Sequence, residues 1–101
     1  MAYPDPDKEH VILQETATLL KLLAEPMRLQ LLTILREKEY CVKELVELTG
    51  AGQANISKHL SLLCIKGVVS RRKEGLYAYY FVSNQAVFTI LDSAFLAMKK
   101  K

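Results

Sequence analysis

The sequence predicts a mainly α-helical domain that carries one small β-hairpin. Over most of the chain, apolar residues recur every three or four positions, which is the spacing of one helix face. Between about residues 68 and 82 this spacing gives way to a run rich in β-branched and aromatic residues around Glu74-Gly75. A two-residue turn that contains Gly is typical of a hairpin, because Gly accepts a positive φ. The 101 residues leave room for one domain.

Two helices are expected in the first part of the chain. The first covers about residues 9–24, and the second begins at Pro26 and ends near Glu37. Proline suits the first turn of a helix, because its missing N–H has no partner there. Residues 1–8, which carry two prolines, are expected to form a flexible arm.

Two shorter helices separated by a tight turn are expected next. The first ends at Thr49-Gly50, where Gly is the usual left-handed stop residue. After Ala51-Gly52, the second runs from Gln53 to about Ile65. A helix, a short turn with Gly and another helix form the pattern of a helix-turn-helix. Followed by a β-hairpin, this order is typical of a winged helix-turn-helix.

A last helix is expected after the hairpin, capped by Ser83 or Asn84 and followed by a short basic tail, residues 99–101. Its apolar stripe is wide for so small a domain, so we expect it to pair with a second copy of the chain, joined by the first helix. The stripe could instead cover the domain's own core. The expected dimer interface comprises Ile12, Leu19, Val87, Ile90, Leu91, Ala94, Phe95 and Met98.

The net charge of +3 is unevenly distributed. Residues 1–50 hold six basic and nine acidic side chains, whereas residues 51–101 hold eight basic and two acidic ones. From Ala51 to Lys73 there are five basic residues and no acidic one. Such a stretch favours a polyanion, since lysine and arginine displace counterions from phosphates. A solvated positive face is the alternative.

Several classes of protein are not expected. No run reaches the roughly 18 apolar residues of a membrane span, and the N-terminus lacks the apolar centre of a signal peptide. Two cysteines are too few for a disulfide framework, so we expect a cytoplasmic protein with free thiols and no membrane partner. The one candidate catalytic pair, Cys64 with His59, would lie more than about 100° apart around a helix. We therefore expect neither an enzyme nor a cofactor.

Four segments of the sequence resemble the ArsR/SmtB family of bacterial transcriptional repressors. The resemblance rests on "LLKLLAEPMRLQLLTIL", "CVKEL", "ANISKHLSLL" and "KGVVSRRKEGLYAYYFV", in this order, and covers roughly residues 12–98. It implies a winged helix-turn-helix domain, here residues 9–98, that binds operator DNA as a homodimer. Many members of the family leave DNA when a metal ion or a thiol-reactive signal arrives.

The second helix of the helix-turn-helix is expected to enter the major groove. Its outward side chains suit base edges, since Gln pairs with adenine, Lys reaches guanine, and Ala touches a thymine methyl. The hairpin is expected to contact the DNA backbone. The predicted DNA-binding residues are Gln53, Ala54, Ser57, Lys58, Ser61, Arg71, Arg72 and Lys73. Arg72→Ala would then weaken binding to all duplexes about equally.

The sequence departs from the metal-sensing members of the family that it resembles. Those with a Cys-Val-Cys motif have two thiols where this chain has Cys41-Val42-Lys43. On the last helix, the positions that hold zinc in other members are Asn84, Ala86, Ala97 and Lys100, which are unsuited to the metal. No metal site is therefore expected.

A thiol switch stays open as a hypothesis. Cys41 is expected at the start of its helix, where unpaired N–H groups favour the thiolate. Cys64 is expected beside the inward face, where it would act mainly as a small apolar residue, and it is the second candidate for redox sensing.

A winged helix used as a protein-interaction or RNA-binding module is the alternative function. For RNA, Tyr77, Tyr79 and Phe81 would be the stacking side chains.

Overall fold

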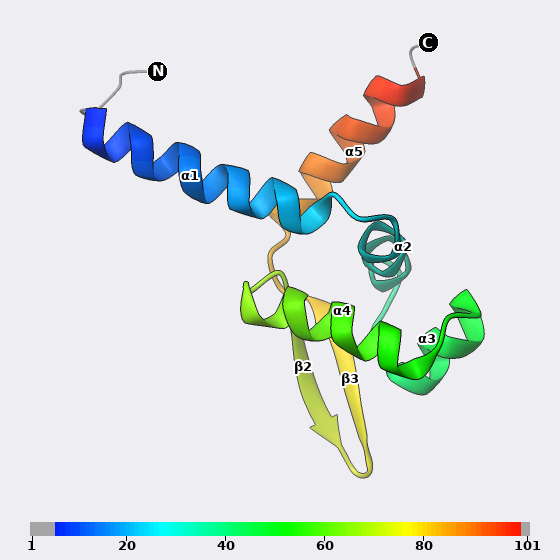
Figure 1. Ribbon diagram of the computed structural model, residues 1–101. Coiled ribbons are helices and arrows are strands. Elements are labelled where there is room, and N and C mark those ends of the chain that lie inside the picture. The colour runs from blue at the N-terminus through cyan, green and yellow to red at the C-terminus, as the bar shows by residue number, and fades with distance from the viewer. Residues whose placement is uncertain (1–5, 100–101) are drawn as a thin grey trace.

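The computed structural model describes residues 6–99 and confirms the predicted fold class: six-residue strands form a hairpin beside five helices (Figure 1). The elements are α1 Pro6–Leu23, α2 Pro26–Leu35, β1 Tyr40–Cys41, α3 Val42–Thr49, α4 Gln53–Ile65, β2 Val69–Glu74, β3 Tyr77–Val82 and α5 Ala86–Lys99. No helix in the described part of the chain is long and apolar enough to cross a membrane.

The core lies where the end of α1, α2, α3, α4, the base of the hairpin and the first turns of α5 meet. It consists of aliphatic side chains that are almost fully buried: Leu23, Leu31, Leu32, Leu35, Leu45, Ile56, Leu60, Leu63, Val68, Val69, Val82, Val87 and Leu91. On α4 the buried positions are spaced four and three residues apart, so they fall on one face of the helix. The opposite face of α4 therefore does not belong to the core.

The sheet has three antiparallel strands in the order β1-β3-β2, one more than predicted. The short strand β1 pairs with β3 at Tyr40↔Tyr80 and Cys41↔Tyr79. The predicted hairpin turn is wrong by one residue: Glu74 pairs with Tyr77, and Gly75-Leu76 form the turn. Gly75 has φ +62°, which suits the first position of a type II′ turn.

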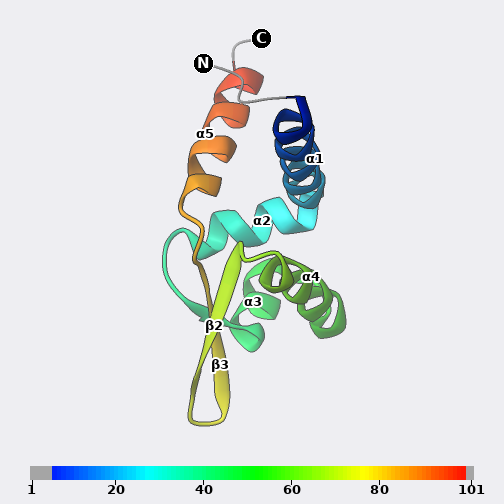
Figure 2. The same ribbon diagram turned by 90° about the vertical axis from the view of Figure 1, so that its left-hand side faces the viewer.

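The helices α1 and α5 project from the end of the molecule opposite the hairpin (Figures 1 and 2), and in the view of Figure 1 they diverge from each other. The start of α1 at Pro6 corrects the arm predicted over residues 1–8, of which only 6–8 are described. Likewise Lys99, expected in the tail, is the last residue of α5, and residues 100–101 lie outside the described part. The second helix ends at Leu35, two residues earlier than predicted.

Candidate nucleic-acid interface

The turn between α3 and α4 fixes where the second helix of the motif begins. Gly50 adopts φ +75°, the left-handed conformation that ends a helix, and its N–H donates to the carbonyl of Val46 at 2.8 Å. The hydroxyl of Thr49 accepts from the N–H of Ala51 at 3.1 Å. Only Gly50, Ala51 and Gly52 separate the two helices, so α4 starts in a fixed direction beside α3.

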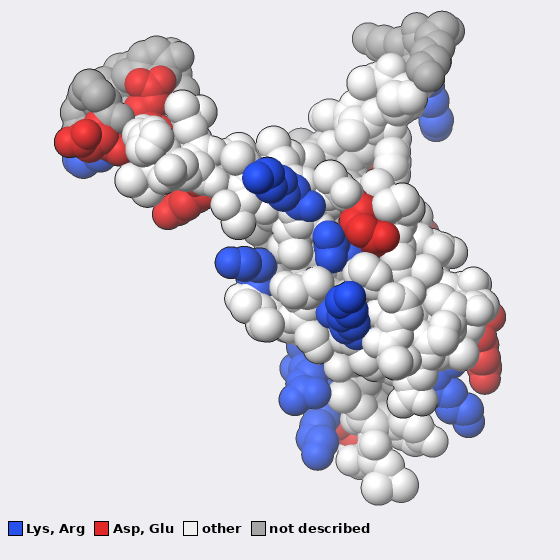
Figure 3. Space-filling model, viewed as in Figure 1, with Lys and Arg blue, Asp and Glu red and all other residues white. Residues whose placement is uncertain are grey.

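The outward face of α4 presents most of the side chains that the sequence predicts for base contact. Gln53, Ala54, Lys58 and Ser61 are exposed, and Ser57 is half-buried. Basic side chains lie over α4 and along one edge of the hairpin on the face that Figure 3 shows. The five predicted α4 residues therefore share one accessible helix, with amide, hydroxyl and ammonium groups free to meet a ligand.

The three basic residues of the wing, the hairpin β2–β3, do not point the same way. Side chains alternate along a strand, so Arg71 and Lys73 share the face of buried Val69, and Arg72 lies on the other. Arg71 lines a hollow together with residues of α4, including Ser61. Among the described residues, neither Arg71 nor Lys73 forms an ion pair with a carboxylate. These two charges are therefore available on the α4 side.

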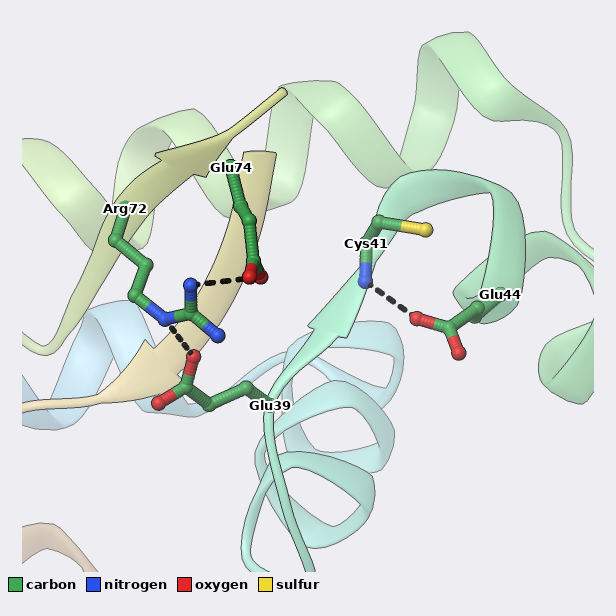
Figure 4. A network of polar contacts seen from close by, with 5 residues as sticks. All are labelled: Glu39, Cys41, Glu44, Arg72 and Glu74. Carbon is green, nitrogen blue, oxygen red and sulfur yellow. Dashed lines mark hydrogen bonds and ion pairs between the residues drawn. The ribbon is translucent and has the colours of Figure 1, made fainter. Parts of the chain in front are cut away.

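Arg72 is held on the opposite side of the sheet (Figure 4). Its Nε lies 2.6 Å from Oε1 of Glu39, and its Nη1 lies 2.9 Å from Oε2 of Glu74. The guanidinium also lies 5.2 Å from the ring centre of Tyr79. The two carboxylates raise the pKa of Arg72, with Glu74 the larger cause. Nothing in the sequence indicated the partner Glu39, because the contact depends on the pairing of β1 with β3.

The residues predicted for the dimer interface divide into two groups. Val87 and Leu91 are buried in the core of the protomer itself, which corrects their assignment, and Leu19 and Ile90 pack partly against that core. The others are exposed on the projecting helices: Ile12, Ala94, Phe95 and Met98. Further exposed apolar side chains on the same two helices are Val11, Leu13, Leu20 and Leu96. The projecting halves of α1 and α5 thus carry apolar surface that their own protomer does not cover.

The two cysteines are free thiols with different surroundings. Cys41 is buried at the start of α3, where its N–H donates to Oε1 of Glu44 at 2.9 Å (Figure 4). This hydrogen bond lowers the pKa of the Glu44 carboxyl. Cys64 is half-buried on α4, and burial raises the pKa of its thiol although the charge of Arg71 opposes the shift.

No group of three His, Cys, Asp or Glu side chains within residues 6–99 could hold a metal ion. Asn84 caps the start of α5, where its Oδ1 accepts a hydrogen bond from the N–H of Ala86 at 3.2 Å. His59, which the sequence places at the edge of the buried face, contacts residues at the start of α2. Sequence reasoning missed these contacts, because the partners lie 31 and 34 positions earlier in the chain.

Comparison with known proteins shows that the sequence is similar to bacterial regulators. Residues 25–71 match the family model described as bacterial regulatory protein, arsR family. The nodulation protein NolR of Rhizobium meliloti is 35% identical over 90 residues, which cover 89% of this chain and 74% of NolR. The transcriptional repressor PagR of Bacillus anthracis is 33% identical over 84 residues, 82% of this chain and 84% of PagR.

A solved structure shows the same fold. The homodimeric winged helix-turn-helix DNA-binding domain of Mb0332 from Mycobacterium bovis aligns with a TM-score of 0.83 and 26% identity. The alignment covers 98% of this chain and 92% of that domain.

Proposed function

Because the chain belongs to the arsR family, a family of DNA-binding transcriptional regulators, we propose that it is a homodimeric repressor of a palindromic operator. In this proposal α4 enters the major groove, and Gln53, Ala54, Ser57, Lys58 and Ser61 face the base edges. The observation that carries the proposal is the free, acid-poor face that α4 shares with one side of the wing.

The wing contributes phosphate contacts. Arg71 and Lys73 point to the side of α4 without a carboxylate partner among the described residues, so each can neutralise a phosphate. Arg72, which the sequence also predicts as a contact, would first have to leave Glu39 and Glu74. Phosphate contacts fix the register of the protein on the duplex and leave the choice of sequence to α4.

The exposed apolar surface on α1 and α5 supports a dimer. The projecting helices leave Ile12, Phe95 and Met98 exposed, at 55%, 40% and 59% of their surface. Mb0332, with the same fold, is described as a homodimer. Two copies related by a two-fold axis would present two α4 helices to two half-sites, so we expect a palindromic operator.

Selection of duplexes from a random pool tests the proposal. The wild-type chain should enrich a palindrome, and Lys58→Ala should accept more bases at one position of each half-site while the protein stays folded. Loss of one bidentate contact costs about 1–3 kcal/mol of discrimination. A chain that enriches no duplex, or that prefers single-stranded RNA of the same sequence, would contradict the proposal and favour an RNA-binding module.

We propose that the signal that releases the repressor acts through a thiol. Cys41 lies at the start of α3, and Cys64 lies on α4 beside Arg71, so modification of either would disturb an element of the interface. Mass spectrometry after treatment with sulfide or peroxide, combined with binding to the selected duplex, tests this role. Unmodified thiols with unchanged affinity would exclude both cysteines.

A further inference from the structure

A polar cluster joins three helices at the base of α1. Arg28, on α2, donates from Nε to the carbonyl of Leu22 in the last turn of α1 at 2.6 Å. Its Nη1 lies 3.4 Å from Nδ1 of His59, on α4. Glu25 caps α2 by accepting from the N–H of Arg28 at 2.9 Å, and its Oε2 lies 3.8 Å from the same His59 nitrogen. One guanidinium therefore bridges the end of α1 and the middle of α4.

His59 is the most sheltered member of the cluster. Only 12% of its side chain is exposed, against 33% for Glu25, and Arg28 is half-buried. When a buried polar group loses its hydrogen-bond partner, no water molecule can take the partner's place. The loss is therefore costly, and such contacts resist rearrangement. Arg28 has a planar, rigid set of donors, which fixes the direction of both of its bonds.

Polar contacts between α4 and the helices α1 and α2 are confined, among the described residues, to His59. Within the described part of the chain, no side chain of α4 other than His59 forms a hydrogen bond or ion pair with α1 or α2. His59 directly follows Lys58, which we propose as a base contact. The remaining packing between these helices is aliphatic, through residues such as Leu60 and Leu31, and lacks the directionality of a hydrogen bond.

We propose that Arg28 and His59 are positioning residues that hold α4 at a fixed angle to α1 and thereby set the half-site spacing that the dimer accepts. The inference rests on the proposed function, because α1 must belong to the dimer interface and α4 must enter the groove. In a dimer, a small rotation of α4 against α1 changes the distance between the two recognition helices. The cluster therefore determines spacing specificity without touching DNA.

The test uses the full chain and the duplex that the wild type selects, together with versions carrying one or two extra base pairs at the centre. The measured quantity is the ratio of affinities for the selected and the lengthened duplexes. Arg28→Lys keeps the charge but cannot donate in two fixed directions, and His59→Phe keeps a ring but removes the nitrogens. Each should lower the ratio about fivefold, the lower end of typical coupling between sites. The double variant should lower this ratio no further than either single variant does.

Two conservative variants separate positioning from simple loss of stability. The amide oxygen of His59→Asn lies close to the position of Nδ1, so this variant should keep the wild-type ratio. His59→Gln places its amide oxygen near the position of Nε2 and should lower the ratio. Arg72→Lys, on the far side of the wing, is the matched control for Arg28→Lys and should leave the ratio unchanged. Urea unfolding identifies the variants that are folded.

The outcomes distinguish the two proposals. If the wild type enriches no duplex, the proposed function fails and the inference fails with it. If the wild type binds a palindrome, but folded Arg28→Lys and His59→Gln keep its spacing ratio, the inference alone is overturned. Equal loss of affinity for every spacing would also overturn it, because such a loss shows a structural role only.

Discussion

Replacement of Arg71 by Ala should reduce the salt dependence of DNA binding, whereas replacement of the neighbouring Arg72 should not. Arg71 faces the α4 side of the wing, and its guanidinium has no carboxylate partner among the described residues. Arg72 lies between Glu39 and Glu74 at 2.6 and 2.9 Å. Its charge is already compensated, so few counterions would be released when it meets a phosphate.

The magnitude follows from the number of phosphates neutralised. Each contact contributes about 0.9 to the slope of log K against log salt, and a dimer has two wings, so Arg71→Ala should lower the slope by about 1.8. Between 50 and 200 mM salt, the wild type should then lose about 12-fold more affinity than the variant. The slope for Arg72→Ala should stay close to that of the wild type. The sequence alone predicted this phosphate contact for Arg72 as well.

Fluorescence anisotropy with the selected duplex, titrated at four or more salt concentrations, gives the slopes. An unchanged slope for Arg71→Ala would refute the assignment of this side of the wing to DNA. A loss of slope for Arg72→Ala as large as for Arg71→Ala would show that phosphates displace Glu39 and Glu74 in the complex. Urea unfolding of both variants checks that they are folded at each salt concentration.

Three further predictions concern assembly and stability. Phe95→Glu places a charge on the exposed stripe of α5 and should convert the dimer to a monomer in sedimentation, whereas a dimer that persists would refute this interface. Leu60→Ala should lower the free energy of unfolding in urea by about 2–5 kcal/mol, because the side chain is fully buried, whereas exposed Ile65→Ala should change it by less than about 0.5 kcal/mol. Glu44→Ala should cost about 1 kcal/mol at pH 7 by removing the bond from the Cys41 N–H. Since the folded-state pKa of Glu44 is lowered, this contribution is complete above the ordinary carboxyl pKa of about 4.3 and is lost as the pH falls through the lowered value. Urea unfolding at pH 7 and pH 3 should therefore show a cost for Glu44→Ala that shrinks in acid, and a constant cost would refute this role.

Local signals in the sequence predicted most of the secondary structure. The bounds of α3 and α4 agree with those expected from Gly50 and from the spacing of Ile56, Leu60 and Leu63. The hairpin was predicted one residue out of place, because Glu74-Gly75 and Gly75-Leu76 both put Gly in a two-residue turn. Only the pairing of β2 with β3 decides between these registers. Strand β1 has two residues, too few for any periodicity to show.

The assignment of apolar residues to a core or to an interface could not be made from periodicity. Val87, Leu91 and Phe95 follow one another at helical spacing and are indistinguishable as a pattern. In the structure α5 starts against the core and then leaves it, so the first two are buried and the third is exposed. The point at which a helix departs from its domain depends on the packing of the whole chain.

The sequence by itself determined the order of the helices and the hairpin, together with the family, and it identified an acid-free segment that favours a polyanion, because helix spacing, glycine positions and charge are local properties. Only the tertiary structure decided which charges are free. Arg71 and Arg72 are adjacent and chemically identical in the sequence, but strand alternation turns one toward α4 and the other toward Glu39. Similarly, the cluster of Arg28 and His59 joins residues 31 positions apart. Contacts between distant segments depend on how the helices pack, and no local pattern records that packing.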